Sequence, residues 1–133
     1  MDELDELANE ILSANVGEDV MRGKAHMENG KRRALENTGM DDDSIEKMLD
    51  ALSDYRWIGE AGEIDIGSHI RYLLPGTCKL RNGGHVCKPV VGNSQMYLLC
   101  KNSWGRFFQV PVDGTLVFQR LTETEQLVAQ LLQ

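Results

Sequence analysis

Four side chains that could ligate a metal lie in the second half of the chain: Cys78, His85, Cys87 and Cys100. Thiolates and imidazoles are preferred zinc ligands, but a structural zinc site usually takes two ligands from one tight Cys-x2-Cys turn. The three cysteines are too widely spaced for such a turn, so we interpret Cys87 and Cys100 as small apolar groups inside strands. The sequence therefore predicts no metal site and no cofactor.

The histidines and serines give little support for nucleophilic catalysis. Ser68 directly precedes His69, but neighbouring residues on a strand point to opposite faces and cannot form a dyad. The chain has no Gly-x-Ser-x-Gly or Cys/His signature, and Gly83-Gly84 lacks the spacing of a phosphate-binding loop. We therefore predict that the protein is not an enzyme and has no catalytic residues.

Basic side chains are interleaved with aromatic ones between residues 67 and 120, where Asp113 is the only acid. Small barrels can bind single-stranded nucleic acid by stacking bases on aromatic side chains in a basic groove. A small barrel also needs aromatic residues for its core, and the whole chain carries a net charge of −7, which repels phosphate. Nucleic acid is therefore the alternative partner and protein the preferred one. The candidate contacts are Arg71, Arg81, Lys101, Trp104 and Arg106.

An apolar stripe at helical spacing lies near the N-terminus, at Leu4, Leu7, Ile11 and Leu12. A helix this short is not stable alone in water, so the stripe needs a partner surface. We predict that these four residues bind protein, either the rest of the chain or another subunit.

The charge of the chain changes sign at Asp65. Up to that residue there are 18 Asp/Glu against 7 Lys/Arg, and after it 3 against 7. The hydrophobic period changes from 3.6 to 2 at the same point. We therefore predict two parts: an acidic helical arm over residues 1–62, and a small basic β-barrel with a C-terminal covering helix over residues 63–133. The charges of the two parts can attract each other, within one molecule or between neighbours.

The arm is predicted to contain a weak helix and a stronger one. Residues 18–38 are poor in large apolar side chains and read as a marginal helix or an extended arm that ends at Gly39. Within them, Lys31-Arg32-Arg33 reads as a solvated helix face. A better helix follows, with Asp43 as its N-cap and Glu46 as the reciprocal partner.

Five short strands joined by tight turns are predicted after residue 63. Asn82-Gly83-Gly84 and Asp113-Gly114 are hairpin signals, because Asn and Gly accept positive φ easily. Such a meander needs closure to protect its edges, which favours a five-stranded antiparallel SH3-like or OB-like barrel. Thr122 and Glu125 form a capping box that begins a C-terminal helix. The predicted fold class is α+β.

Part of the chain resembles a known class of module. The stretch 64–72, followed by 79–84 and by a turn and strand centred on Trp104, resembles small β modules in structural proteins of large icosahedral DNA viruses. The resemblance spans residues 64–121, about half of the chain. It implies a minor capsid or virion component that holds major capsid units together, and it assigns no functional residue.

These observations favour a non-enzymatic assembly subunit that binds other proteins in a hetero-oligomeric or multi-copy complex. The alternative is a small-barrel protein that binds single-stranded nucleic acid and carries an acidic autoinhibitory arm. No apolar run approaches the ~18–20 residues of a membrane span, and the acidic N-terminus is unlike a secretory signal. We expect a cytoplasmic or nuclear protein, or a virion protein if the chain is viral, with no membrane partner.

Overall fold

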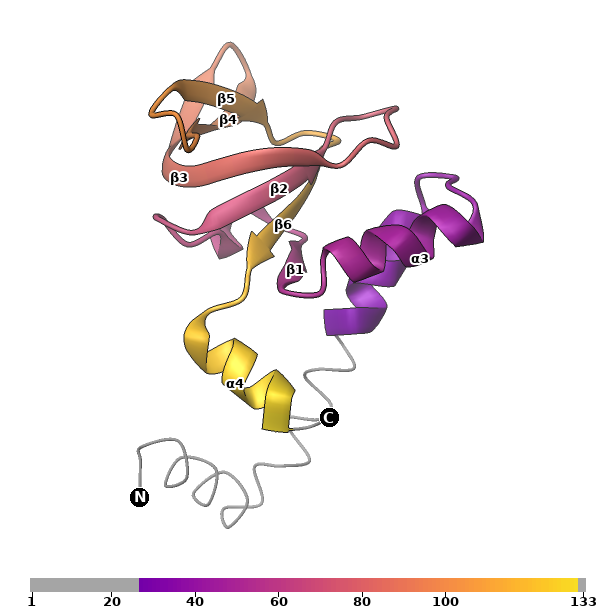
Figure 1. Cartoon of the computed structure of the whole chain (residues 1–133). Helices are drawn as coiled ribbons and strands as arrows, with labels where there is room; N and C mark the ends of the chain where they lie inside the picture. The colour runs from indigo at the N-terminus through magenta and orange to yellow at the C-terminus, as the bar shows by residue number, and fades with distance from the viewer. Residues whose placement is uncertain (1–26, 132–133) are drawn as a thin grey trace, which may run out of the picture.

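The computed structural model describes residues 27–131 of the 133-residue chain as an α+β protein (Figure 1). Two helices, at residues 27–36 and α3 (Asp42–Ala51), precede an antiparallel sheet, and helix α4 (Glu123–Leu131) follows it. The strands are β1 (Tyr55–Ile58), β2 (His69–Leu73), β3 (Arg81–Gly92), β4 (Gln95–Lys101), β5 (Phe107–Pro111) and β6 (Leu116–Arg120), with a 3-10 turn η1 (Ala61–Glu63) after β1.

The sheet has six strands in the order β1-β6-β2-β3-β4-β5 and is not closed. The predicted five-stranded barrel is therefore wrong in strand number and in closure. The sixth strand is β1, which lies before residue 63, where no strand was predicted; α3 ends at Ala51, and Tyr55–Ile58 pairs antiparallel with β6. Among the described residues, no strand pairs with the far edges of β1 and β5.

Asn82-Gly83-Gly84 is not a turn but lies inside β3, so the predicted hairpin is wrong. Asp113-Gly114 is a turn, but it joins β5 to β6, which do not pair with each other, so the second predicted hairpin is wrong as well. Ile70 pairs with Gly84 and Arg71 with Asn82, which leaves Gly83 as the extra residue of a β-bulge. A Cβ on Gly83 would lie 2.2 Å from the carbonyl oxygen of Ile70, which leaves no room for a side chain there. These glycines are required by close backbone approach rather than by a turn.

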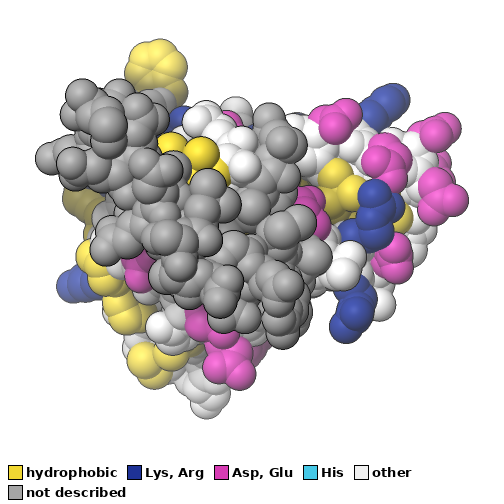
Figure 2. Space-filling view, turned by 90° about the horizontal axis from the view of Figure 1, so that it is seen from below, with side chains coloured by type: hydrophobic (Ala, Val, Ile, Leu, Met, Phe, Trp, Pro, Cys, Tyr) yellow, Lys and Arg dark blue, Asp and Glu magenta, His cyan; other side chains and the backbone are white. Residues whose placement is uncertain are grey.

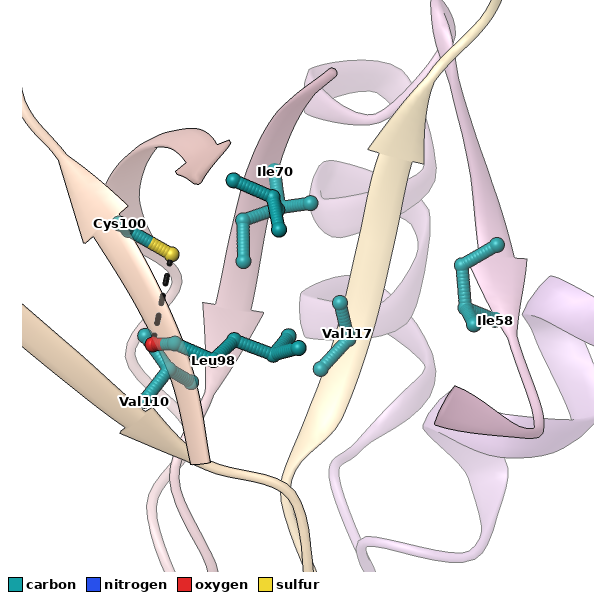
Figure 3. Packing of buried hydrophobic residues seen from close by; sticks show 7 residues of the cluster. Ile58, Ile70, Leu98, Cys100, Val110 and Val117 are labelled. Carbon is teal, nitrogen blue, oxygen red and sulfur yellow. Dashed lines mark hydrogen bonds between the residues drawn. The ribbon is translucent and has the colours of Figure 1, made fainter. Parts of the chain in front are cut away.

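The core consists of two hydrophobic clusters, one on each face of the sheet. The first is enclosed by the curled sheet itself and includes Ile70, Leu98 and Val117 (Figure 3). The second lies between the helices and strands β2 and β6, and its buried residues are Leu35, Ile45, Leu52, Leu73 and Phe118. Residues 27–62 are thus packed against the sheet, across the predicted boundary at residue 62, and the structure does not confirm an acidic arm. Leu4, Leu7, Ile11 and Leu12 lie outside the described residues.

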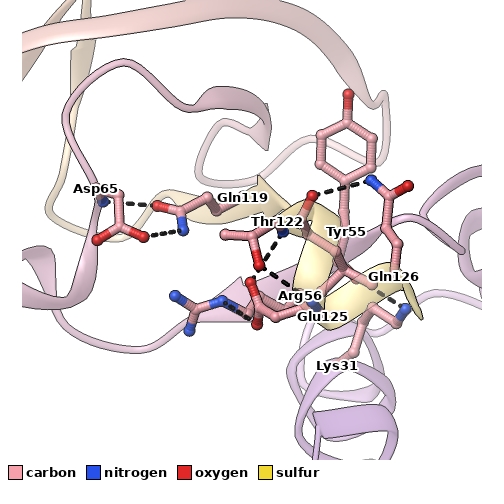
Figure 4. Close-up of polar contacts among 9 residues, drawn as sticks. Lys31, Tyr55, Arg56, Asp65, Gln119, Thr122, Glu125 and Gln126 are labelled. Atoms are coloured by element: carbon pink, nitrogen blue, oxygen red, sulfur yellow. Dashed lines mark hydrogen bonds and ion pairs between the residues drawn. The ribbon is translucent and has the colours of Figure 1, made fainter. Parts of the chain in front are cut away.

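Lys31 is buried, although its basic run was interpreted as a solvated helix face. Its Nζ donates to the carbonyl oxygens of Leu52 (2.9 Å) and Tyr55 (3.0 Å) and lies 3.2 Å from Glu28 Oε1 (Figure 4). Leu52 is the C-cap of α3, which has no basic residue in its own last turn. Lys31 therefore supplies, from the preceding helix, the cation that suits the negative end of α3.

The attraction expected between the acidic and basic parts is not what joins them in the described residues. The ion pair that crosses residue 65 is Arg56–Glu125 (3.5 Å), in which the acidic part supplies the base. Arg32–Glu46 (2.8 Å) lies within the helical part, where Figure 2 shows acidic and basic side chains mixed over the right-hand side. Buried apolar surface between helices and sheet is the main connection.

Both predicted helix starts can be compared with the structure. Asp41, not Asp43, caps α3: its Oδ1 accepts from Ser44 N at 2.8 Å, and hydrogen bonding by Ser44 lowers the pKa of Asp41. The capping box of α4 is confirmed, since Thr122 and Glu125 each accept from the other's backbone N–H. No helix within residues 27–131 is long and apolar enough to cross a membrane.

Candidate binding face of the sheet

One face of the sheet carries both the helices and two of the predicted contact residues, Arg71 and Lys101. Residues paired across antiparallel strands share a face, so the pairs Phe118–Arg71, His69–His85, His85–Lys101 and Lys101–Phe107 trace one continuous surface from β6 to β5. We call this surface the outer face.

The helices cover only part of the outer face. Phe118 and Leu73 on β6 and β2 are buried against them, and we call this part the covered half. In Figure 1 the helices lie beside β1 and β6, away from β4 and β5. The part over β3–β5 carries Lys88, Tyr97, Leu99, Lys101 and Phe107, all exposed or half-buried, and we call it the open half.

A polar pocket of about 320 Å³ lies between the two halves. In it the Tyr55 hydroxyl lies 2.9 Å from His69 Nδ1, and the His69 and His85 rings meet edge to face with centroids 5.2 Å apart. The β3 bulge supplies the pocket with two glycines that have no side chain to fill it. We call it the histidine pocket; its lining is Tyr55, His69, Arg71, Asn82, Gly83, Gly84, His85 and Ser103.

Burial and the neighbouring charges at this pocket disfavour the protonated form of His69. Burial lowers the pKa of His69 below its usual value, and positive charge on His85, Arg120 and Arg71 lowers it further. A neutral His69 can accept a hydrogen bond from the Tyr55 hydroxyl at Nδ1. The pocket lining contains no Asp or Glu.

Arg71 has spare hydrogen-bonding capacity at this pocket. Its guanidinium donates to the carbonyl oxygen of Ala51 at 3.2 Å, which ties β2 to the end of α3. Its Nε is buried and has no hydrogen-bond partner among the described residues. A buried donor without an acceptor is costly, so an acceptor in this position would be favourable.

The loop between β4 and β5 is held by one side chain. Asn102 Oδ1 accepts from the backbone N–H groups of Trp104 and Arg106, both at 3.0 Å, and Gly105 takes a φ of 79°. This loop presents Trp104 with 86% of its surface exposed. Beside it Phe107 is 62% exposed, and Lys101 Nζ lies 5.5 Å from its ring centroid. We call residues 101–107 the β4–β5 tip.

The predicted contact residues fall into three places. Lys101, Trp104 and Arg106 are brought together at the β4–β5 tip, because they lie on one hairpin. Arg71 lines the histidine pocket, and Arg81 is exposed at the start of β3, outside the pocket lining.

Sequence reasoning missed the meeting of Tyr55, His69 and His85. It treated Asn82-Gly83-Gly84 as a turn, which hid the pairing of His69 with His85. The available signal was Gly83-Gly84, a glycine pair that can form a bulge and that lies between His69 and His85 in the sequence.

The cysteines do not converge. Cys78 is exposed and Cys87 half-buried, whereas Cys100 is buried and burial raises the pKa of its thiol to about 11. Within residues 27–131, no group of three or more His, Cys, Asp or Glu side chains is placed to hold a metal ion.

No match to this chain was found among family models, curated proteins or solved structures. Function must therefore be argued from the open half, the β4–β5 tip and the histidine pocket.

Proposed function

We propose that this protein is a non-enzymatic assembly subunit that binds an acidic, extended segment of a neighbouring subunit along β5 and the β4–β5 tip. The observation that carries the proposal is the unpaired edge of β5 next to two exposed aromatic side chains, Trp104 and Phe107.

An unpaired edge strand offers a row of backbone donors and acceptors to another chain. β5 pairs only with β4 among the described strands, so its far edge is free to accept an added strand. Proteins usually protect such an edge with short length, charge or cover. Here the neighbouring Trp104 and Phe107 are apolar and exposed, which is typical of a protein-binding surface.

The charge of this hairpin favours an acidic partner. Residues 95–112 contain Lys101 and Arg106 and no Asp or Glu. Residues 1–26 have the complementary charge, with seven Asp/Glu against two Lys/Arg. A second copy of the chain could supply this segment, which would give a multi-copy assembly. The resemblance to capsid modules would place that assembly in a virion.

Self-association of the full chain tests this proposal. Native mass spectrometry and sedimentation velocity should show concentration-dependent oligomers for the wild type. Trp104→Ser and Phe107→Ser should weaken them, whereas Val91→Ser should not, because Val91 is an exposed apolar residue of β3 outside the tip. A wild-type chain that stays monomeric at all concentrations would contradict the proposal, as would oligomers that the three variants affect equally.

The second candidate is single-stranded nucleic acid, favoured by the cation and aromatic groups of the tip. Lys101 lies over the Phe107 ring, and Trp104 presents a free face for stacking. Oligonucleotide binding should quench the fluorescence of Trp104, the component that Trp104→Phe lacks. Binding should weaken steeply as the salt concentration rises. Absence of quenching at low salt would remove this candidate.

A further inference from the structure

We propose that the histidine pocket binds a phosphate group, with Arg71, His85 and Ser103 as its main contacts. No residue of β5 lines this site, although Ser103 belongs to the β4–β5 tip, and the inference does not depend on the proposed function.

The pocket is lined mainly by groups that donate hydrogen bonds. Arg71, Asn82, Ser103 and the two imidazoles can all donate, and no carboxylate lines the space to compete. Arg71 places a guanidinium in the lining, and this group suits the oxygens of a phosphate. The lining therefore matches an oxyanion with several acceptor oxygens rather than a cation.

The groups around the pocket disfavour a further positive charge on His69. Burial lowers the pKa of His69, and three neighbouring groups lower it further: His85 on β3, Arg120 on β6 and Arg71 on β2. Tyr55 on β1 contacts His69 through a neutral hydroxyl. A bound anion would offset the repulsion and raise the pKa of His69, so binding should strengthen as the pH falls.

Gly83 and Gly84 line the pocket with backbone alone. A Cβ on Gly84 would lie 2.3 Å from the carbonyl oxygen of Lys101, so the β3 backbone approaches its neighbours without side chains at this position. A metal is a poorer occupant, because the lining supplies two imidazoles and no third ligand of the usual kinds.

Titration of the full-length protein with sulfate tests the proposal without a change in ligand charge. Ring resonances of His69 and His85, followed by NMR at about pH 6 and about pH 8, should shift saturably, with tighter binding at the lower pH. The pKa of His69 should rise with sulfate present. Arg71→Gln should weaken binding about tenfold, the loss expected for one charge-assisted contact. Arg33→Gln, at an exposed arginine of the helix at residues 27–36 and outside the pocket lining, should leave it unchanged.

A second variant keeps the test decisive if Arg71→Gln does not fold. His85→Gln removes an exposed side chain of the pocket and should weaken sulfate binding. A response that stays linear in sulfate, or equal affinity in wild type and both pocket variants, would show an adventitious ion only and overturn the proposal.

Two further probes identify the source of the phosphate. A nucleoside monophosphate presents a phosphate monoester, and an oligonucleotide without terminal phosphate presents only diesters. Competition with sulfate by the monophosphate supports a free or terminal phosphate, and competition by the oligonucleotide supports a nucleic-acid backbone. Failure of both, with inorganic phosphate also failing to compete, would overturn the assignment.

Discussion

The covered and open halves of the outer face belong to one sheet, yet they treat similar side chains in opposite ways. Phe118 in the covered half is 0% exposed beneath the helices, and Phe107 in the open half is 62% exposed. Lys31 is buried against backbone carbonyls beside the covered half, and Lys101 in the open half lies at the surface over an aromatic ring.

This difference shows how the outer face is buried where helices pack against it. In the covered half, an apolar cluster packs against the helices, and Lys31 donates to the carbonyl oxygen of Leu52 at the C-terminal end of α3. The open half has aromatic and aliphatic groups of the same kind, including Tyr97 and Leu99, but no helix of residues 27–131 lies over them. Its composition is that of a surface that another molecule can cover, which is why we assign the partner-binding role to it.

The largest contrast should come from the two phenylalanines. Phe118→Ala should lower the free energy of unfolding by about 4 kcal/mol, because it leaves a cavity between sheet and helices. Phe107→Ala should change it by less than about 0.5 kcal/mol, since the ring is mostly in solvent. Urea denaturation measures both. Similar losses for the two variants would break the distinction between the halves.

Lys31 should be the next most costly residue to replace. Lys31→Met keeps the side-chain stem but removes the ammonium, which leaves the carbonyls of Leu52 and Tyr55 without this donor. We expect a loss of about 3 kcal/mol. Lys101→Met is the matched control in the open half, and its stability should remain close to that of the wild type. A Lys31→Met protein as stable as this control would show that the buried cation is not needed for the cover.

The bulge between the halves should tolerate no side chain. Gly84→Ala would force its Cβ against the Lys101 carbonyl and should cost about 2 kcal/mol through backbone displacement. Gly62→Ala, where no atom lies within 4 Å of the added Cβ, serves as the control and should be neutral or slightly stabilising. Thermal denaturation followed by circular dichroism would compare them; an unchanged midpoint for Gly84→Ala would mean that β3 passes its neighbours less closely than described.

The smallest effect should be the pH dependence contributed by His69. Its pKa is lowered in the folded state, so the unfolded chain takes up a proton first as the pH falls below about 6.5. The folded state should therefore lose stability through that range, until the pH is below the folded pKa. In His69→Gln this part of the loss should disappear, as seen in urea midpoints between neutral and mildly acidic pH. An identical pH profile in the variant would mean that another group causes this loss of stability.

Local patterns predicted the elements that local forces determine. The α4 capping box, the helix end near Gly39 and the strands β4–β6 follow from nearby residues, and so does the grouping of Lys101, Trp104 and Arg106 on one hairpin. The predicted cap of α3 was two residues late, because Asp41 and Asp43 are equally suited to the role by type.

Long-range contacts determine the features that were mispredicted. β1 is a strand because β6, more than fifty residues later, pairs with it. Asn82-Gly83-Gly84 has the local preferences of a turn, but the backbones of β2 and β4 fix it as a bulge. Lys31 is buried because two carbonyls from a later part of the chain surround its ammonium. The histidine pocket is lined by residues of β1, β2, β3 and the β4–β5 loop, so it could not be inferred from spacing.

The hydrogen bonds from Asn102 have a thermodynamic consequence for any partner of Trp104. They fix the loop backbone when the protein folds, so little conformational entropy remains to be lost when the indole is bound. Asn102→Ala would then weaken binding without removing a single contact to the partner, and the loss would appear as a less favourable entropy of association.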